Sequence, residues 1–98
     1  MSYTIVRESF RQSINDTFWE FDQAANTHFT ETYLSKGLSS GRTITYSPDE
    51  LTQYRTNTWL SIDEWIMFSN DPVMIPSFAS RDQYNADNRI YSFIQLGV

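Results

Sequence analysis

The chain has 98 residues, of which 40% are hydrophobic and 19% are charged, and its net charge at pH 7 is −5. This length fits a single domain, and the composition is too apolar for a disordered chain. An acidic chain whose few basic residues are scattered along the sequence repels phosphate backbones, so direct binding of DNA or RNA is not expected. The absence of cysteine excludes disulfides, iron–sulfur clusters and cysteine-ligated zinc.

Neither a signal peptide nor a transmembrane helix is predicted. The first residues, M-S-Y-T-I-V-R-E, lack the basic flank and the long apolar run of a signal peptide. No segment approaches the ~20 apolar residues that are needed to cross a bilayer. The sequence therefore favours a soluble cytoplasmic protein that binds neither membranes nor nucleic acids.

The first part of the chain predicts a strand and then a helix. Residues 3–10 are rich in β-branched and aromatic side chains, as strands are. Thr17 and Glu20 have the spacing of a capping box, and apolar side chains recur behind them at helical intervals. These patterns predict a helix over residues 18–36, which ends before Gly37 because glycine readily adopts the left-handed conformation that follows a helix.

A β-hairpin is predicted next. Residues 42–46 and 51–59 alternate in polarity and are rich in threonine. The stretch S-P-D-E between them is typical of a turn, with proline at its second position. We expect two antiparallel strands whose threonines face water or a polar cavity.

The second helix is predicted to be interrupted. Ser61 and Glu64 form another capping box, so the acidic pair in S-I-D-E-W is explained by helix initiation and not by acid catalysis. The N-D-P sequence at residues 70–72 predicts a break and a restart, because proline suits the first position of a helix. Apolar residues then continue at helical spacing to about Asn88, with a bend expected near Pro76.

The predicted order is strand, helix, strand, strand, helix, strand, with residues 90–96 as the last strand. This is the ferredoxin-like β-α-β-β-α-β arrangement of the α+β class, a four-stranded antiparallel sheet with two helices on one face. The first and last strands carry apolar side chains on both faces. Helices on one face would leave the other face exposed, and such surfaces are often interfaces. We therefore expect a homodimer that pairs sheet to sheet.

The order of elements, the chain length, the N-D-P break and the apolar last strand resemble the dimeric α/β-barrel superfamily. Its members include antibiotic-biosynthesis-type monooxygenases, EthD-like proteins and many small proteins of unknown activity. The resemblance is architectural and spans nearly the whole chain. It implies a ferredoxin-like monomer, sheet-to-sheet pairing and a cavity between each sheet and its own helices.

His28 and Tyr54 are the candidate proton-handling residues. His28 is the single histidine and lies at the edge of the apolar stripe of the first predicted helix, where it could face such a cavity. A histidine at such a boundary more often forms a hydrogen bond to a neighbour or to water. No metal-ligand spacing and no glycine-rich nucleotide motif occurs in the sequence, so we expect neither a metal nor a cofactor.

Aromatic and charged side chains are candidates for the lining of a pocket. The aromatic candidates are Trp19, Trp59, Trp65, Tyr91 and Phe93. Aromatic residues at these spacings are more often core, but they could enclose a small apolar ligand. Arg7 and Glu8 on the first strand and Arg55 on the third could place a charge at a pocket or an interface, or lie at a solvated sheet edge.

Three functions remain open from the sequence. The first is a small homodimeric protein whose biological role the sequence does not assign. The second is a cofactor-independent oxygenase or isomerase that acts on a small apolar or aromatic substrate in the sheet–helix cavity, with His28 or Tyr54 handling the proton. The third is an accessory protein, for instance a viral one, that binds another protein through its sheet. A filled cavity would exclude the second function, and a stable homodimer would bury the surface that the third requires.

Overall fold

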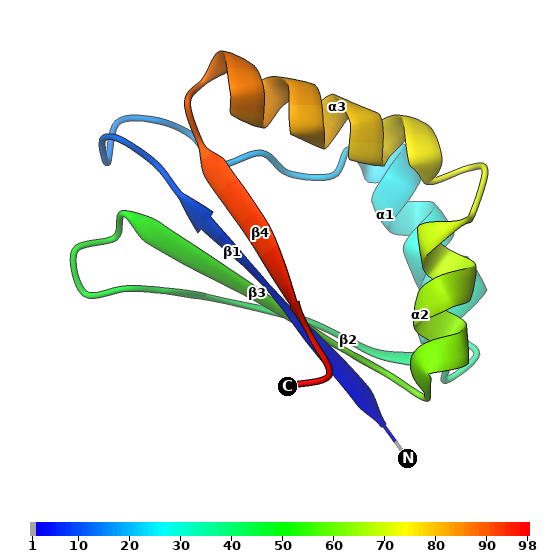
Figure 1. The fold of residues 1–98 in the computed structure, drawn as a ribbon. Coiled ribbons are helices and arrows are strands. Elements are labelled where there is room, and N and C mark those ends of the chain that lie inside the picture. The colour runs from blue at the N-terminus through cyan, green and yellow to red at the C-terminus, as the bar shows by residue number, and fades with distance from the viewer. Residues whose placement is uncertain (1) are drawn as a thin grey trace.

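Four strands and three α-helices follow one another in the computed structural model, which describes residues 2–98. Their order is β1 (Tyr3–Phe10), α1 (Gln23–Phe29), the π-helix η1 (Thr30–Leu34), β2 (Ser39–Tyr46), β3 (Thr52–Trp59), α2 (Ile62–Ser69), α3 (Ile75–Asp87) and β4 (Tyr91–Leu96). The helices gather on one side of the sheet (Figure 1).

All four strands form one antiparallel sheet in the order β2-β3-β1-β4. The central pair, β1 and β3, runs in register from Tyr3 opposite Trp59 to Phe10 opposite Thr52. β4 pairs with the other edge of β1, and β2 pairs with the other edge of β3. This strand order is that of the ferredoxin-like fold, so the predicted α+β architecture is confirmed.

The first helix begins later than predicted. Residues 17–22 form no helix, and α1 starts after Asp22, whose carboxylate accepts a hydrogen bond from the Ala25 backbone nitrogen at 2.8 Å. The capping box predicted at Thr17 and Glu20 is therefore wrong. After α1 the chain widens into η1, and the helical segment ends before Gly37, which has the predicted positive φ of 72°.

The hairpin of β2 and β3 is confirmed, but β2 starts earlier than predicted, at Ser39. A β-bulge lies between Ser39 and Arg42, because Ser39 pairs with Trp59 whereas Arg42 pairs with Asn57. Gly41 within the bulge has a φ of 103°, which a glycine adopts readily. The bulge resets the alternation of side chains and so decides which face of the sheet receives Arg42.

The start of α2 and the break after it are confirmed. Ser61 is the N-cap, and its hydroxyl accepts a hydrogen bond from the Asp63 backbone nitrogen at 3.2 Å and donates one to the Glu64 carboxylate. α2 and α3 are separate helices, as the break at 70–72 predicts, but α3 begins at Ile75 after the N-cap Met74 and not at Pro72. Pro76 lies in the first turn of α3, so it helps to begin this helix and does not bend it as predicted.

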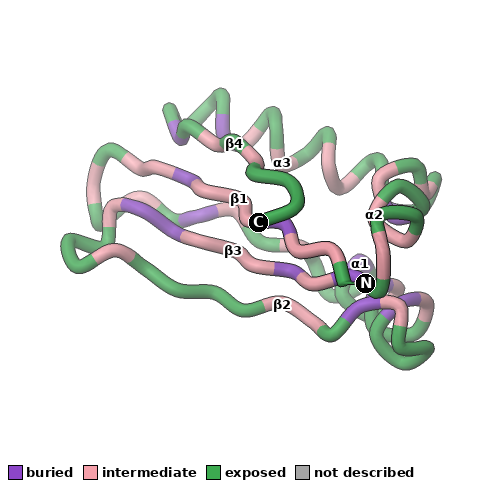
Figure 2. The backbone as a smooth tube through the Cα atoms, turned by 60° about the horizontal axis from the view of Figure 1, so that its bottom comes forward, coloured by how far each residue is buried: buried purple, intermediate pink, exposed green. Residues whose placement is uncertain are grey.

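The hydrophobic core lies between the sheet and the helices, at the end where β1 begins. Its centre is the fully buried Trp59, which contacts Phe29 and Phe68 with ring centroids 6.0 and 4.8 Å apart. Buried positions follow the central strands, whereas β2 is largely exposed (Figure 2). Within residues 2–98, no helix is long and apolar enough to span a membrane.

The sheet carries apolar side chains on both faces, as predicted. On β4, Ile94 faces the helices, while the side chains of Tyr91 and Phe93 on the outer face are 69% and 49% exposed. Phe93 lies beside Phe10 of β1, with ring centroids 5.4 Å apart. The helices described here leave this outer aromatic strip uncovered.

Candidate functional site

A partly open pocket of about 200 Å³ lies beside the core, between the sheet and the helices. Its apolar lining consists of Ile5, Phe21, Trp65, Phe68, Phe78 and Ile94. Its polar lining consists of Arg7, Arg42, Arg55, Asn57, Ser69 and Arg81. All four strands, both later helices and the loop before α1 therefore contribute to one cavity.

Four of the seven basic residues of the chain meet in this pocket, although they are far apart in the sequence. Arg7 and Arg55 are direct partners across β1 and β3, so their side chains leave the same face of the sheet. The bulge in β2 brings Arg42 to this face as well, and Arg81 reaches the pocket from α3. The fold thus concentrates positive charge inside an acidic protein.

Only one of these arginines has a carboxylate partner among residues 2–98. Arg81 Nε donates to Asp82 Oδ1 at 3.1 Å, and the Asp82 side chain is 70% exposed. Arg7 instead donates from Nη1 to the hydroxyl of Ser92 at 3.0 Å. An exposed ion pair such as Arg81–Asp82 contributes little to folding stability, and it neutralises only one of the four positive charges.

The remaining two arginines also bind neutral groups. Arg42 Nη2 donates to Asn26 Oδ1 at 2.6 Å. Arg55 donates from Nε to Gln53 Oε1 at 3.0 Å and from Nη2 to the carbonyl of Trp19. Neutral acceptors orient a guanidinium group but leave its charge uncompensated.

Aromatic rings supply part of the stabilisation that carboxylates would otherwise give. The guanidinium carbon of Arg42 lies 4.7 Å from the ring centroid of Phe21 and 4.9 Å from that of Phe29. The guanidinium carbon of Arg81 lies 5.3 Å from the centroid of Phe78. Such cation–π contacts hold the positive charge in place without neutralising it.

The surroundings disfavour the charged form of these arginines. Burial, followed by the nearby charge of Arg81, lowers the pKa of Arg7 to about 10. Burial and then the charge of Arg55 lower the pKa of Arg42. Burial lowers the pKa of Arg55 as well, and the carboxylate of Glu20 only partly counteracts it. Arginine side chains keep their charge at neutral pH, so a bound anion would offset both the cost of burying these charges and their mutual repulsion.

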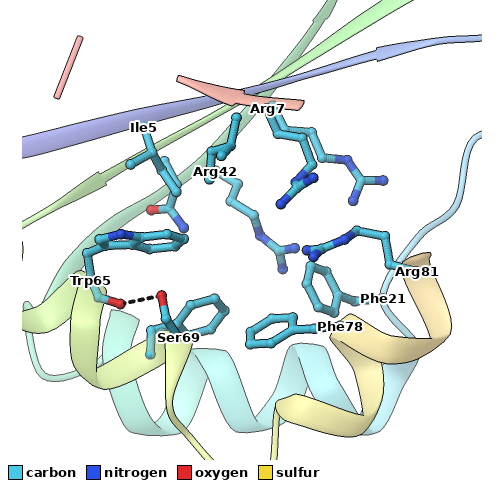
Figure 3. Close-up of a pocket in the computed structure, with 12 residues that line it drawn as sticks. Ile5, Arg7, Phe21, Arg42, Trp65, Ser69, Phe78 and Arg81 are labelled. Carbon is cyan, nitrogen blue, oxygen red and sulfur yellow. Dashed lines mark hydrogen bonds between the residues drawn. The ribbon is translucent and has the colours of Figure 1, made fainter. Parts of the chain in front are cut away.

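The pocket has a charged end and an apolar end. The guanidinium groups of Arg7, Arg42 and Arg81 point toward the middle of the cavity, near the rings of Phe21 and Phe78 (Figure 3). At the opposite end lie Ile5, Trp65 and Ser69 (Figure 3). The Ser69 hydroxyl is already used, since it donates to the Trp65 carbonyl at 2.8 Å. The arrangement suits an amphipathic anion.

The two candidate proton-handling residues lie away from this pocket and from each other. His28 Nε2 is 2.7 Å from Asp71 Oδ2, and the buried Tyr33 hydroxyl donates to the same oxygen at 2.6 Å. His28 thus forms the neighbour hydrogen bond that is common for a boundary histidine. Tyr54 is adjacent to Arg55 on β3, so its side chain lies on the outer face of the sheet.

The five aromatic candidates occupy different places. Trp65 lines the pocket, and Trp59 is buried in the neighbouring core. Trp19 borders a separate hollow of about 10 Å³ that shares three of the arginines. Tyr91 and Phe93 lie on the outer face of the sheet.

Most lining residues were not singled out from the sequence, among them Phe21, Arg42, Phe78 and Arg81. Arg42 could not be assigned to a face because the bulge at Gly41 breaks the alternation. The helical spacing of Phe21 and Phe78 indicated that both belong to the hydrophobic core. Of the four arginines, only Arg7 and Arg55 carried a usable signal, since a charged side chain in a central, partly apolar strand indicates a polar cavity.

Within residues 2–98, the pocket lining includes no carboxylate and no histidine, and no group of three or more potential metal ligands occurs. The chain matches no protein-family model, no curated protein and no solved structure. The chemistry of the pocket is therefore the basis for inferring the function.

Proposed function

We propose that the protein binds a small organic anion in the pocket beneath its sheet. The observation that carries the proposal is the convergence of three guanidinium groups, those of Arg7, Arg42 and Arg55, none of which has a carboxylate partner among the described residues. The planar guanidinium fork matches the oxygens of carboxylates and phosphates. Aromatic walls beside it would hold the apolar part of the same ligand.

The size of the cavity limits the ligand. Sites for drug-sized ligands measure about 300–1,000 Å³, whereas this pocket measures about 200 Å³. A small metabolite fits this space. The rest of the chain holds three basic against 12 acidic residues, so a large polyanion would be repelled by the surrounding surface.

Binding is a better description of this pocket than proton-transfer catalysis. A general base must lie within hydrogen-bond reach of the proton that it removes. His28 is tied to Asp71, and Tyr54 is on the opposite face of the sheet. No feature of the pocket favours the oxygenase or isomerase alternative over simple ligand binding.

Thermal unfolding with three single-ring probes tests the proposal. Benzoate and phenyl phosphate should raise the Tm, while benzyl alcohol, which has the ring but no charge, should not. A ligand at 100 times its Kd stabilises a protein by about 2.7 kcal/mol, which corresponds to a shift on the order of 10 °C for a domain of this size. Arg7→Met should abolish the shift, and Lys36→Met, which removes an exposed charge far from the pocket, should not. Equal shifts with all three probes would contradict anion binding.

We also propose that two copies pair through the outer faces of their sheets, as in a dimeric α/β barrel. The exposed Tyr91 and Phe93, together with Phe10, support this pairing because they form an aromatic strip on the uncovered face. The pocket opens on the opposite side of the sheet, so dimerisation and ligand binding would not compete. The alternative, capture of a different protein on this strip, predicts a monomer in isolation.

A further inference from the structure

The charge balance of the pocket restricts the kind of anion that fits it. Four guanidinium groups line the cavity, and a single exposed carboxylate, that of Asp82, contacts one of them. A bound monoanion would leave at least two positive charges uncompensated in a desolvated space. A dianion comes closer to neutrality, and electrostatic stabilisation grows with each compensated charge at low local dielectric.

The available donors restrict the shape of the anion. Each arginine has five N–H donors, and among the described residues Arg7 and Arg81 each use one of their N–H donors, on Ser92 and Asp82 respectively. These groups approach from the sheet on one side and from α3 on the other (Figure 3). A carboxylate presents two oxygens in one plane, whereas a phosphate presents three terminal oxygens that diverge. The diverging oxygens of a phosphate can therefore accept hydrogen bonds from Arg7 on the sheet and from Arg81 on α3 at the same time.

The volume of the pocket restricts the apolar part. A cavity of about 150 Å³ holds a benzene molecule, and this one measures about 200 Å³ and is partly open. One ring therefore fits between Trp65, Ile5 and the charged end. A nucleotide, which has a fused ring, a sugar and its phosphates, does not.

We infer that the ligand is a phosphate monoester of a single-ring apolar group, with its dianionic head between Arg7 and Arg81 and its ring toward Trp65. This inference rests on the proposed function, because it specifies the anion that the same pocket takes. The smallest probe of this class is phenyl phosphate.

Calorimetric titration with four probes at pH 7.5 separates the parts of the inference. Phenyl sulfate keeps the ring and the tetrahedral head but carries one charge, benzoate keeps the ring with a planar head, and inorganic phosphate lacks the ring. Phenyl phosphate should bind at least about tenfold more tightly than each of the others, because the loss of a charge-assisted interaction, or of the buried ring, is worth a factor of this order. Arg81→Met should remove most of this preference, whereas Lys36→Met should retain it. If the methionine variant does not fold, Arg81→Lys serves in its place. It keeps the charge but lacks the planar pair of N–H donors, so it should also weaken the preference for phenyl phosphate.

The pH dependence provides an independent readout. The second pKa of a phosphate monoester is about 6, so the affinity for phenyl phosphate should fall about tenfold between pH 7 and pH 5. Arg7, whose pKa is about 10, keeps its charge over this range, and the carboxylates that act on Arg55 and Arg7 are those of Glu20 and Asp82. Phenyl sulfate does not titrate here, so its affinity controls for any effect of pH on the protein itself.

The outcomes separate the two proposals. Equal affinity for phenyl sulfate or benzoate would overturn the dianionic head and leave anion binding intact. Equal affinity for inorganic phosphate would overturn the single-ring body. Binding of none of the four probes at millimolar concentration would overturn the proposed function and, with it, this inference.

Discussion

At the scale of single residues, one carboxylate ties the helices together. Asp71 Oδ2 accepts a hydrogen bond from the Tyr33 hydroxyl and forms another with His28 Nε2. Asp71 Oδ1 accepts a hydrogen bond from the Val73 backbone nitrogen at 2.9 Å. The sequence indicated that Asp71 lies at a break between helices and that His28 is a boundary residue. The hydrogen bond between them was not predictable, because they are 43 positions apart in the sequence. Only the fold places the segment between α2 and α3 beside α1.

Asp71→Ala should therefore destabilise the fold strongly. It leaves the buried Tyr33 hydroxyl without an acceptor and removes the side-chain acceptor of the Val73 backbone nitrogen, which together cost about 2–4 kcal/mol of unfolding free energy. Urea denaturation measures this loss. Asp82→Ala, at an exposed ion pair, should change stability by less than about 1 kcal/mol, and a similar loss for both variants would contradict the bridging role of Asp71.

The same residue should make stability depend on acid pH. Burial tends to raise the pKa of Asp71, but the hydrogen bonds from Tyr33 and His28 outweigh it and hold the pKa below its ordinary value. A carboxylate with a lowered folded pKa stabilises the fold above its unfolded pKa of about 3.9, and this contribution is lost as the pH falls through the folded value. Denaturation midpoints between pH 6 and pH 2.5 should drop more steeply in wild type than in Asp71→Asn. Parallel curves would show that Asp71 does not carry this dependence.

At the scale of elements, the sequence located most boundaries but misplaced the start of the first helix. Apolar residues recur at helical spacing from Phe18, yet Phe18 is buried from a loop, where it packs against Tyr46 and under Arg11. Burial of a loop residue imitates one turn of an amphipathic helix. Periodicity alone cannot separate the two cases, because the same side chains face the core in both.

Two alanine substitutions distinguish these starting points. Asp22→Ala removes the side chain that caps α1 and should cost about 1 kcal/mol of unfolding free energy. Thr17→Ala should cost less than about 0.5 kcal/mol, because the exposed Thr17 side chain caps nothing and only its backbone carbonyl is used, by Tyr84. Chemical denaturation of the two variants under one set of conditions gives the comparison. The reverse order would restore the helix start predicted from the sequence.

At the scale of the whole molecule, the fold creates a property that the sequence conceals. The basic residues are dispersed along the chain, but the register of β1 with β3, the bulge in β2 and the placement of α3 bring four arginines into one cavity. The strand order was predictable from the order of elements. A cavity between sheet and helices was expected, but its arginine lining was not, since that lining depends on a one-residue bulge and on contacts between residues far apart in sequence.

The two faces of the sheet then have separate roles, which oligomeric state can test. If the outer aromatic strip pairs with a second copy, light scattering should give about 23 kDa, twice the 11.5 kDa of one chain. Phe93→Glu places a carboxylate in the middle of the aromatic strip, beside Glu8, and should give a folded monomer, because pairing would bury these charges without a partner. Met67→Glu changes a side chain of similar exposure on α2 and should remain a dimer.

The monomeric variant also links the dimer to the pocket. Phe93 lies on the outer face while the arginines line the inner one, so the Phe93→Glu monomer should bind phenyl phosphate with the affinity of wild type. Loss of binding on dissociation would mean that the partner copy completes the site. A wild-type monomer would refute sheet-to-sheet pairing and leave the aromatic strip free for a different protein, which is the one arrangement in which the accessory function remains consistent with the fold.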